Sequence, residues 1–392
     1  MAGKLPSART AAVRELRHPE SGELLDEALV LRFDGPASST GEDVVEFQCH
    51  GGRAVVASVL SALGSFEALR EARPGEFTRR AFENGRIDLT EAEGLADLIE
   101  AETESQRKAA LTMAEGGLRR QIDLWRQHVL DLSARAERAI DYDEDDLGPD
   151  SGLTEACLAL AGELRQWLGR PSAERLKDGI RVVIAGPPNV GKSSLINAIV
   201  GSERAIVTDT PGTTRDHIEV PLSLGGMPVL LTDTAGLRRT EDAVEAIGVA
   251  RAFMLAEAAD VLVWLGEPSE APPHRLLIKV HAQADRPDRA HVPDGTTPVS
   301  AVTGSGLALL LGRIADLAKQ ILPEEGAIAL NRRQTERLEE AANALRDAGD
   351  SADLVLIAEQ LRQARTAFDR LTGRAGVEDL LDALFGRFCL GK

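Results

Sequence analysis

Apolar and polar positions follow three different patterns along the chain. Up to Ile87, short apolar runs alternate with glycine and proline, and residues 29–33 and 44–47 form apolar segments bounded by turn residues. Such segments predict strands, because glycine, proline and aspartate interrupt regular structure on either side of them. We therefore expect a small α+β domain over residues 1–87.

A helical region is expected from residue 88 to residue 176. Thr90-Glu91-Ala92-Glu93 has the form of a capping box and predicts the start of a helix. Further on, apolar side chains recur at steps of four and three, as on one face of an amphipathic helix: Leu118, Ile122, Trp125, Val129 and Leu132. The acidic run from Asp141 to Asp146 is expected to end a helix in a solvated turn.

Strands and helices alternate from about Lys177 onward. Four apolar segments have the character of strands: residues 181–185, 228–232, 260–265 and 276–280. Alternation of this kind predicts a parallel sheet covered on both faces. After Pro323 the chain returns to helix. We expect an α/β domain over residues 177–322, inserted between the two parts of one α-helical domain at 88–176 and 323–392, which is tolerated where the inserted termini lie close together.

Composition narrows this picture. The length of 392 residues suggests two or three domains, and 43% hydrophobic residues with only 3% aromatic ones favour helices packed through aliphatic side chains. A formal net charge of −18 repels nucleic acid from most of the surface. An RNA substrate would therefore require a local basic patch or a partner that holds the RNA.

The three cysteines, Cys49, Cys157 and Cys389, form no Cys-x-x-Cys pair. Because three thiols cannot all pair within one chain, we expect a reducing compartment. The sequence has no signal peptide and no apolar run long enough to span a bilayer, so a cytoplasmic protein without membrane contact is expected.

The segment Gly186-Pro187-Pro188-Asn189-Val190-Gly191-Lys192-Ser193 has the form of a P-loop. Glycines are needed where backbone N–H groups wrap around phosphates, and Gly186 and Gly191 supply these turns. Lys192 would reach the β- and γ-phosphates, and Ser193 would bind magnesium. An apolar strand precedes the loop and a helical segment follows it, so a chance match in an ordinary turn is the weaker explanation.

Two further motifs lie at suitable distances from the P-loop. Asp233-Thr234-Ala235-Gly236 follows an apolar strand and places a carboxylate near the magnesium and a glycine near the γ-phosphate. Thr213-Thr214-Arg215-Asp216 lies between the two motifs, where a switch loop would bring a threonine hydroxyl to the metal. Leu237 follows where many GTPases place a water-orienting glutamine. Glu245 is a candidate for that role, with a solvated helix charge as the alternative explanation.

These motifs, together with the terminal Cys389-Leu390-Gly391-Lys392, resemble the MnmE (TrmE) family of bacterial tRNA modification GTPases. The early segments agree with that family: Thr40-Gly41-Glu42-Asp43, Glu46-Phe47-Gln48-Cys49-His50-Gly51-Gly52 and Arg73-Pro74-Gly75-Glu76-Phe77-Thr78. The resemblance covers nearly the whole chain. It implies an α/β P-loop GTPase domain inserted into an α-helical domain, preceded by a small α+β N-terminal domain that binds folate.

The resemblance implies a GTP hydrolase that uses magnesium and potassium. The implied GTP-binding positions are Asn189, Val190, Gly191, Lys192, Ser193, Ser194, Thr208, Thr213, Thr214, Asp233, Thr234, Ala235, Gly236, Asp285, Ser300, Ala301 and Val302. Potassium would take the place of an arginine finger in stabilising transition-state charge, and its implied ligands are Asn189, Thr208, Thr210 and Thr213. The implied magnesium ligands are Ser193 and Thr214. Lys192 and Glu245 would be catalytic, with Glu245 activating the water.

The resemblance also implies a folate site and a tRNA reaction. A tetrahydrofolate derivative (5-formyl- or methylene-tetrahydrofolate) would be bound at Glu46, at Arg86, where lysine is commoner, and at Lys392. Cys389 would be a catalytic or site-lining thiol, although a lone cysteine near a chain end often has no special role. The implied reaction adds an aminomethyl-type group to C5 of the tRNA wobble uridine (U34), by a homodimer that forms a heterotetramer with an FAD-dependent partner protein.

Two features depart from the family pattern. Guanine specificity commonly rests on Asn-Lys-x-Asp, but Ala282 and Gln283 replace the first two residues while Asp285 remains. Losing the asparagine costs about 1–3 kcal/mol if nothing compensates. We therefore expect weak nucleotide binding, with guanine preference carried by Asp285 and by Ser300-Ala301-Val302. In addition, Gly3-Lys4-Leu5-Pro6 corresponds to a point inside the family pattern. Either the start of the sequence is misassigned or the N-terminal domain lacks its first strand.

Two other functions are compatible with parts of the sequence. A ribosome-assembly GTPase that gates RNA binding would need a basic module, whereas the segment after Pro323 mixes acidic and basic residues. A degenerate homologue without turnover is suggested by Ala282. Against it, the motif residues Lys192, Asp233 and Glu245 are intact.

Overall fold

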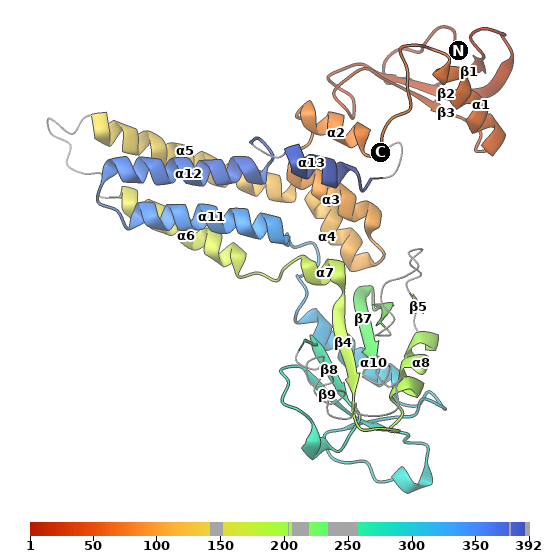
Figure 1. The fold of residues 1–392 in the computed structure, drawn as a ribbon, viewed down its shortest axis with the longest axis vertical. Coiled ribbons are helices and arrows are strands. Elements are labelled where there is room, and N and C mark those ends of the chain that lie inside the picture. The colour runs from red at the N-terminus through yellow and green to blue at the C-terminus, as the bar shows by residue number, and fades with distance from the viewer. Residues whose placement is uncertain (142–151, 203, 206–218, 234–257, 376–377, 389–392) are drawn as a thin grey trace, which may run out of the picture. The chain divides into compact units, whose positions relative to one another are not determined.

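The computed structural model describes residues 1–141, 152–202, 204–205, 219–233, 258–375 and 378–388 (Figure 1). The chain forms two compact units. The first comprises Met1–Ile99, Ala114–Leu124 and Phe368–Lys392, and the second comprises Glu100–Met113 and Trp125–Ala367.

The first unit begins with a three-stranded antiparallel sheet in the order β1-β2-β3. Its strands and the helix on the sheet are β1 (Ala12–Arg17), β2 (Leu24–Phe33), β3 (Val44–Gln48) and α1 (Arg53–Gly64). Alternate residues of the sheet pack with Val59 of α1 in a small core that includes Leu16 and Val30. The strands predicted around residues 29–33 and 44–47 are confirmed. Strand β1 was not expected, because Leu16 is its only buried residue.

The remainder of the first unit is helical and joins distant parts of the sequence. Its helices include α2 (Glu76–Glu83), α3 (Leu89–Glu100) and α13 (Glu378–Phe385). Phe385 and Phe388 pack with Leu89 in one apolar cluster, and the rings of Phe82 and Phe385 have centroids 6.3 Å apart. An ion pair of 2.6 Å between Arg79 and Asp382 adds to this contact. The last described helix is therefore part of the same core as α3.

Helix α3 begins two residues earlier than expected. The capping box lies at Asp88 and Glu91, not at Thr90 and Glu93: the Asp88 carboxylate accepts the Glu91 N–H at 2.9 Å, and the Glu91 carboxylate accepts the Asp88 N–H at 2.7 Å. Thr90 is fully buried and donates its hydroxyl to Asp88. Aspartate caps as well as threonine does, so the two registers were not distinguishable from the pattern alone.

Helices of the second unit pack around aliphatic side chains and one tryptophan. They include α4 (Glu104–Ala114), most of α5 (Gly117–Asp141), α6 (Leu153–Leu168), α7 (Glu174–Asp178), α11 (Arg332–Gly349) and α12 (Leu354–Leu371). Trp125 is fully buried, donates its indole N–H to Glu163 at 2.7 Å and meets Trp167 edge to face. All five apolar positions predicted for one face of α5 are buried, which confirms that prediction.

The α/β part of the second unit carries a seven-stranded sheet in the order β10-β9-β8-β4-β7-β6-β5. Its strands are β4 (Ile180–Ala185), β5 (Arg204–Ala205), β6 (Glu219–Leu224), β7 (Met227–Asp233), β8 (Val261–Trp264), β9 (Leu277–Ala282) and β10 (Thr297–Val299). The five strands from β10 to β7 are parallel. Four of them, β4, β7, β8 and β9, correspond to the predicted segments, whereas β10 was not expected. Strand β6 pairs antiparallel with both β7 and β5, which was not expected. The reason is the two-residue turn Gly225-Gly226, which pairs Leu224 with Met227 in a tight hairpin.

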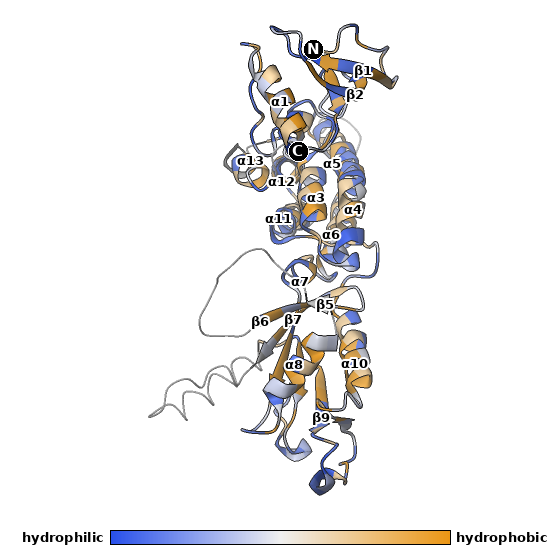
Figure 2. Ribbon diagram, turned by 90° about the vertical axis from the view of Figure 1, so that its right-hand side faces the viewer, coloured by the Kyte–Doolittle hydropathy of each residue, from blue (hydrophilic) through white to orange (hydrophobic). Residues whose placement is uncertain are grey.

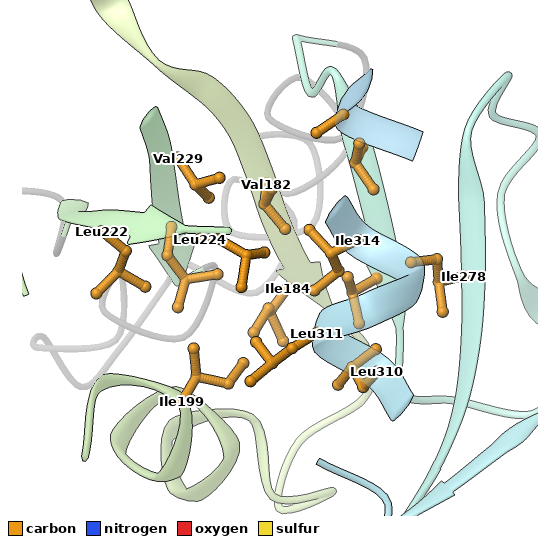
Figure 3. Close-up of a cluster of buried hydrophobic side chains, with 14 of the residues drawn as sticks. Val182, Ile184, Ile199, Leu222, Leu224, Val229, Ile278, Leu310, Leu311 and Ile314 are labelled. Atoms are coloured by element: carbon orange, nitrogen blue, oxygen red, sulfur yellow. The ribbon is translucent and has the colours of Figure 1, made fainter. Parts of the chain in front are cut away.

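One face of this sheet is covered by α8 (Lys192–Ser202) and α10 (Leu307–Lys319). Figure 3 shows Ile199 of α8 and Ile314 of α10 directed at Val182 and Ile184 of the central strand β4. Figure 2 shows apolar residues along β9 and along α10. The chain is thus an α/β P-loop domain inserted between helical segments and preceded by a small α+β segment. The domain limits at residues 87, 176 and 322 stay predictions.

Helix α4 makes three polar contacts with the α/β part. The Ser105 N–H donates to the carbonyl of Gly226 at 3.0 Å, and the Gln106 side chain donates to the carbonyl of Leu176 at 2.9 Å. Lys108 forms an ion pair of 2.9 Å with Glu325. Within the described ranges no helix is both long and apolar enough to cross a membrane.

The Asp88 cap allows a stability test. Burial raises the pKa of the Asp88 carboxyl, and its Oδ2 has no hydrogen-bond partner in the part of the chain that the structure describes. The raised pKa means that the folded state favours the neutral acid. Protonated Asp88 therefore contributes to the free energy of unfolding at low pH, and this contribution is lost as the pH rises through the pKa of the folded state. Asp88→Ala should lower the free energy of unfolding by about 1 kcal/mol, since the cap is lost. Asp88→Asn, which keeps the accepting oxygen without the charge, should match or exceed the parent Tm at pH 7. Equal loss in both variants would contradict this account.

Candidate nucleotide site

The P-loop joins strand β4 to helix α8, as the sequence predicts. Gly186, Asn189 and Gly191 all have positive φ, at 153°, 60° and 100° respectively. Val190 is buried in the core of the sheet, whereas Asn189 is exposed. The loop therefore turns its backbone around a point in front of the N-terminus of α8, where helix N–H groups attract anions.

Lys192 lies inside this loop. Its residue surface is 8% exposed, and its Nζ donates to the carbonyl oxygens of Gly186 at 2.8 Å and Pro187 at 2.7 Å. These two contacts hold the ammonium group within the curve of the loop. Ser193 and Ser194 follow in the first turn of α8 and are exposed. A lysine charge and serine hydroxyls are thus presented at one helix N-terminus, as phosphate and magnesium binding require.

The parallel register brings a second motif beside the P-loop. The backbone of Asp233, the last residue of β7, is paired with Ile184, two residues before Gly186. The carboxyl ends of β4 and β7 therefore lie at the same edge of the sheet. This is the place that the sequence predicts for a carboxylate near the magnesium.

Two loops on the other side of β4 correspond to the predicted base-recognition segments. Ala282 is the last residue of β9, is buried in the core, and is paired with Val299 of β10. Asp285 is exposed beyond the end of β9. Ser300 is buried, and its hydroxyl accepts the Thr303 N–H at 3.1 Å. Both loops leave the same edge of the sheet as the P-loop, where ligands bind in folds of this class.

Gly306 fixes the second of these loops. It precedes α10 with φ of +74°, and a Cβ at this position would lie 1.9 Å from the carbonyl oxygen of Pro298. The Ser300 N–H donates to Ser305 at 2.9 Å in the same turn. Only glycine permits this approach, so Gly306 is a residue of the site that the motif search missed. A Gly-x-Gly immediately before a helix was the available signal.

The predicted folate positions lie in the first unit. A Cβ on Gly41 would lie 3.3 Å from Cγ of Arg86, and the Asn84 side chain donates to the carbonyl of Thr40 at 2.9 Å. The turn before β3 thus packs on Arg86. Glu46 is exposed on β3, where it is paired with Leu31. One turn therefore connects the strand that carries Glu46 to the side chain of Arg86.

The cysteines in the described part of the chain are Cys49 and Cys157, and both are free thiols. Burial raises the pKa of Cys157 to about 11 and also raises the pKa of Cys49. Neither thiol has the lowered pKa of a reactive cysteine. Within the described residues, no cluster of three histidine, cysteine or carboxylate side chains is arranged to hold a metal.

Comparison with known proteins gives two matching family models. The MnmE helical domain matches residues 89–389, and the GTP-binding protein TrmE N-terminus matches residues 1–86. The tRNA modification GTPase MnmE of Rhizorhabdus wittichii is 53% identical over 393 residues, which cover 99% of this chain and 88% of that protein. This chain belongs to the MnmE family of tRNA modification GTPases.

A second MnmE relative, from Novosphingobium aromaticivorans, is 50% identical over 100% of this chain and 92% of its own length. Among solved structures, the G domain of the FeoB iron transporter of T. maritima is 24% identical, covers 36% of this chain and 98% of that one, and has a TM-score of 0.26. Membership of the MnmE family favours tRNA modification over a ribosome-assembly role.

Several residues that the MnmE resemblance implies lie outside the described part of the chain. They are Thr208, Thr210, Thr213, Thr214, Thr234, Ala235, Gly236, Glu245, Cys389 and Lys392. The structure brings the P-loop, the backbone of Asp233 and the loops at Asp285 and Ser300 to one edge of the sheet.

Gly306 and Gly304 form a matched pair for testing this turn. Both have positive φ, but a Cβ on Gly304 would have no atom within 4 Å. Gly304→Ala should therefore cost only the left-handed backbone term of about 1–2 kcal/mol. Gly306→Ala must also displace Pro298, so we expect a larger fall in Tm and weaker GDP binding by fluorescence titration. Equal effects of the two substitutions would contradict the assignment.

Proposed function

We propose that this MnmE-family GTPase hydrolyses GTP with stimulation by potassium, and that it acts as a homodimer in modification of the tRNA wobble uridine. The modification adds an aminomethyl-type group at C5 of U34, jointly with an FAD-dependent partner protein. The observation that carries the proposal is the Lys192 ammonium group held inside a P-loop at the edge where Asp233, Asp285 and Ser300 converge. Family membership supplies the reaction class.

The residues present fit GTP and magnesium. Lys192 holds a positive charge where the loop amides would surround a phosphate, and phosphate oxygens would take the place of its carbonyl partners Gly186 and Pro187. The Ser193 hydroxyl is a hard oxygen ligand in the first turn of α8, of the kind that Mg²⁺ prefers. Bound magnesium would neutralise charge between the β- and γ-phosphates.

The fit for potassium rests on Asn189. This residue is exposed on the P-loop and has a left-handed backbone, so its side-chain amide projects from the loop rather than into the core. An amide oxygen is a suitable ligand for a hard cation, and a cation beside the phosphates stabilises charge that develops in the transition state. Thr208, Thr210 and Thr213 would complete that site, Thr214 would join Ser193 at magnesium, and Glu245 would orient the attacking water.

The folate proposal rests on Glu46 and Arg86. The turn at Gly41 precedes the strand that carries Glu46 and packs on the side chain of Arg86. Arg86 supplies a permanent cation for a carboxylate, and Glu46 supplies an acceptor for ring N–H groups. Bound tetrahydrofolate derivative would supply the one-carbon unit. Cys389 and Lys392 follow Phe388, which is packed in the apolar cluster with Ile87, the neighbour of Arg86. The net charge of −18 is in keeping with a partner that makes most of the tRNA contacts. The proposed location of the reaction is the cytoplasm.

Steady-state hydrolysis of GTP and ATP, each in potassium and in sodium buffer, tests the GTPase proposal. We expect GTP turnover to be at least about ten-fold faster in potassium, because the cation supplies electrostatic stabilisation of the transition state. Equal rates in the two salts, or a preference for ATP, would overturn the proposal. As a control, Glu245→Ala should bind GDP as the parent does but hydrolyse GTP about 100-fold more slowly.

A titration with 5-formyl-tetrahydrofolate tests the second site. Arg86→Ala should weaken binding by about ten-fold or more, since a hydrogen bond to a charged group contributes about 1.5–3 kcal/mol. Arg86→Lys keeps the charge and restores the residue commoner in the family, so it should retain most of the affinity. If the parent shows no binding, the assignment of Glu46, Arg86 and Lys392 fails.

A further inference from the structure

Two residues with unusual backbone conformations meet beside the P-loop. Among the described residues other than glycine, Arg9, Asn189 and Gln283 have positive φ, and the last two have φ of 60° and 58°. The Gln283 side-chain Nε2 donates to the backbone carbonyl of Asn189 at 3.4 Å. A left-handed residue costs about 1–3 kcal/mol and persists where its surroundings impose it. Such strain is therefore concentrated at one contact between the β9 loop and the P-loop.

The orientation of the Gln283 amide is set by its second partner. Arg286 donates through Nη1 to Oε1 of Gln283 at 3.3 Å, and through Nε and Nη2 to the carboxylate of Asp288 at 3.0 Å each. Arginine has donors only, so Oε1 must face Arg286 and Nε2 must face the carbonyl of Asn189. The hydrogen bonds from the Arg286 guanidinium also lower the pKa of the Asp288 carboxyl. The result is a chain of hydrogen bonds from Asp288 to the P-loop.

Ala282 cannot make this connection. Its side chain is a buried methyl group in the core of the sheet, in the place where the family pattern has a polar asparagine. Gln283 instead lies over the end of the P-loop: a Cβ on Gly191 would be 3.4 Å from its Nε2 and 3.6 Å from its Cγ. The residue that replaces the family's lysine thus contacts the backbone on which nucleotide binding depends.

We propose that Gln283 is a positioning residue for the nucleotide site, which fastens the base-recognition loop to the P-loop through the Asn189 carbonyl and compensates for the missing asparagine at Ala282. The proposal rests on the proposed function of the same site. Gln283 acts through Asn189: it holds the left-handed turn that directs the P-loop amides, and it fixes Asp285 at a constant distance from the phosphates. Lysine at this position would keep the donor but would have no acceptor for Arg286.

Three substitutions of Gln283 separate the donor from the acceptor. Gln283→Ala removes both functions. Gln283→Glu has the same shape and keeps the acceptor for Arg286, but places a carboxylate against the Asn189 carbonyl. Gln283→Lys keeps a donor and serves as the conservative variant. Because Gln283 lies in a half-buried loop position, all three should fold with the parent Tm.

The measurement is the Kd of a fluorescent GDP analogue in sodium buffer with magnesium, together with the Tm of each variant. One neutral hydrogen bond corresponds to about a five-fold change in Kd. We expect Kd to rise about five-fold in Gln283→Ala, to rise more in Gln283→Glu, and to stay within about two-fold of the parent in Gln283→Lys. An unchanged Tm with this order of affinities supports positioning, because a merely structural role would move Tm and would not be rescued by lysine.

Parent-like Kd values in Gln283→Ala and Gln283→Glu would overturn the inference. This outcome is distinct from failure of the proposed function, because GDP affinity in sodium does not depend on potassium-stimulated turnover. If the parent protein binds GDP but shows no potassium effect, the potassium mechanism is overturned. The inference about Gln283 is then still tested by the Kd values of its variants for GDP.

Discussion

Parallel pairing of β4 with its neighbours is the constraint on which the nucleotide site depends. Hydrogen-bonded register puts Ile184 beside Asp233 on one side and Val182 beside Val261 on the other. Because parallel strands end at the same edge of a sheet, each loop that leaves this edge is brought to a common centre. Helices α8 and α10 hold the strands in this register by covering one face with aliphatic side chains. The P-loop conformation is thus a consequence of sheet packing as well as of its own glycines.

A second constraint is that the core of the first unit is discontinuous in sequence. Leu89, Phe385 and Phe388 share one cluster although almost 300 residues separate them, as their numbers show. Insertion of an α/β domain into a helical one is tolerated where its two ends lie close together, and on its two sides the Ala173 N–H donates to the carbonyl of Leu330 at 3.0 Å. The contacts of α4 with Gly226, Leu176 and Glu325 tie the inserted part to a helix that precedes it. These contacts fall on the β6–β7 turn and on both ends of the inserted segment.

Sequence patterns predicted most of the fold where the period was clear. Four of the parallel strands and the apolar face of α5 are in their expected places, because a buried strand or an amphipathic helix leaves a regular signal. Strands β1, β5, β6 and β10 escaped prediction: β1 buries one residue, β6 buries two, and β10 is only three residues long. The start of α3 was misplaced by two residues because Asp88 and Thr90 are both good caps by type. In these places tertiary contacts, which the local sequence does not encode, decide between near-equal alternatives.

The candidate site shows the same division. The P-loop could be predicted because phosphate binding demands particular residues at fixed spacing. The contact of Gln283 with Asn189 could not, because the two residues lie on different loops, 94 positions apart, and only the folded chain brings them together. By type alone, Gln283 and Ala282 count as two losses from the family motif. In the structure, the side chain of Gln283 offers a hydrogen-bond donor and an acceptor, whereas the methyl group of Ala282 offers neither.

Net charge gives the last step of this argument. A chain with a charge of −18 can still bind a nucleotide, because the Debye length of about 8 Å at physiological ionic strength screens distant carboxylates. Lys192 and the N-terminus of α8 act at contact distance, where screening is weak. An extended RNA, by contrast, would require a local basic patch or a partner that holds it. The same charge balance is therefore compatible with a nucleotide site that acts at contact distance.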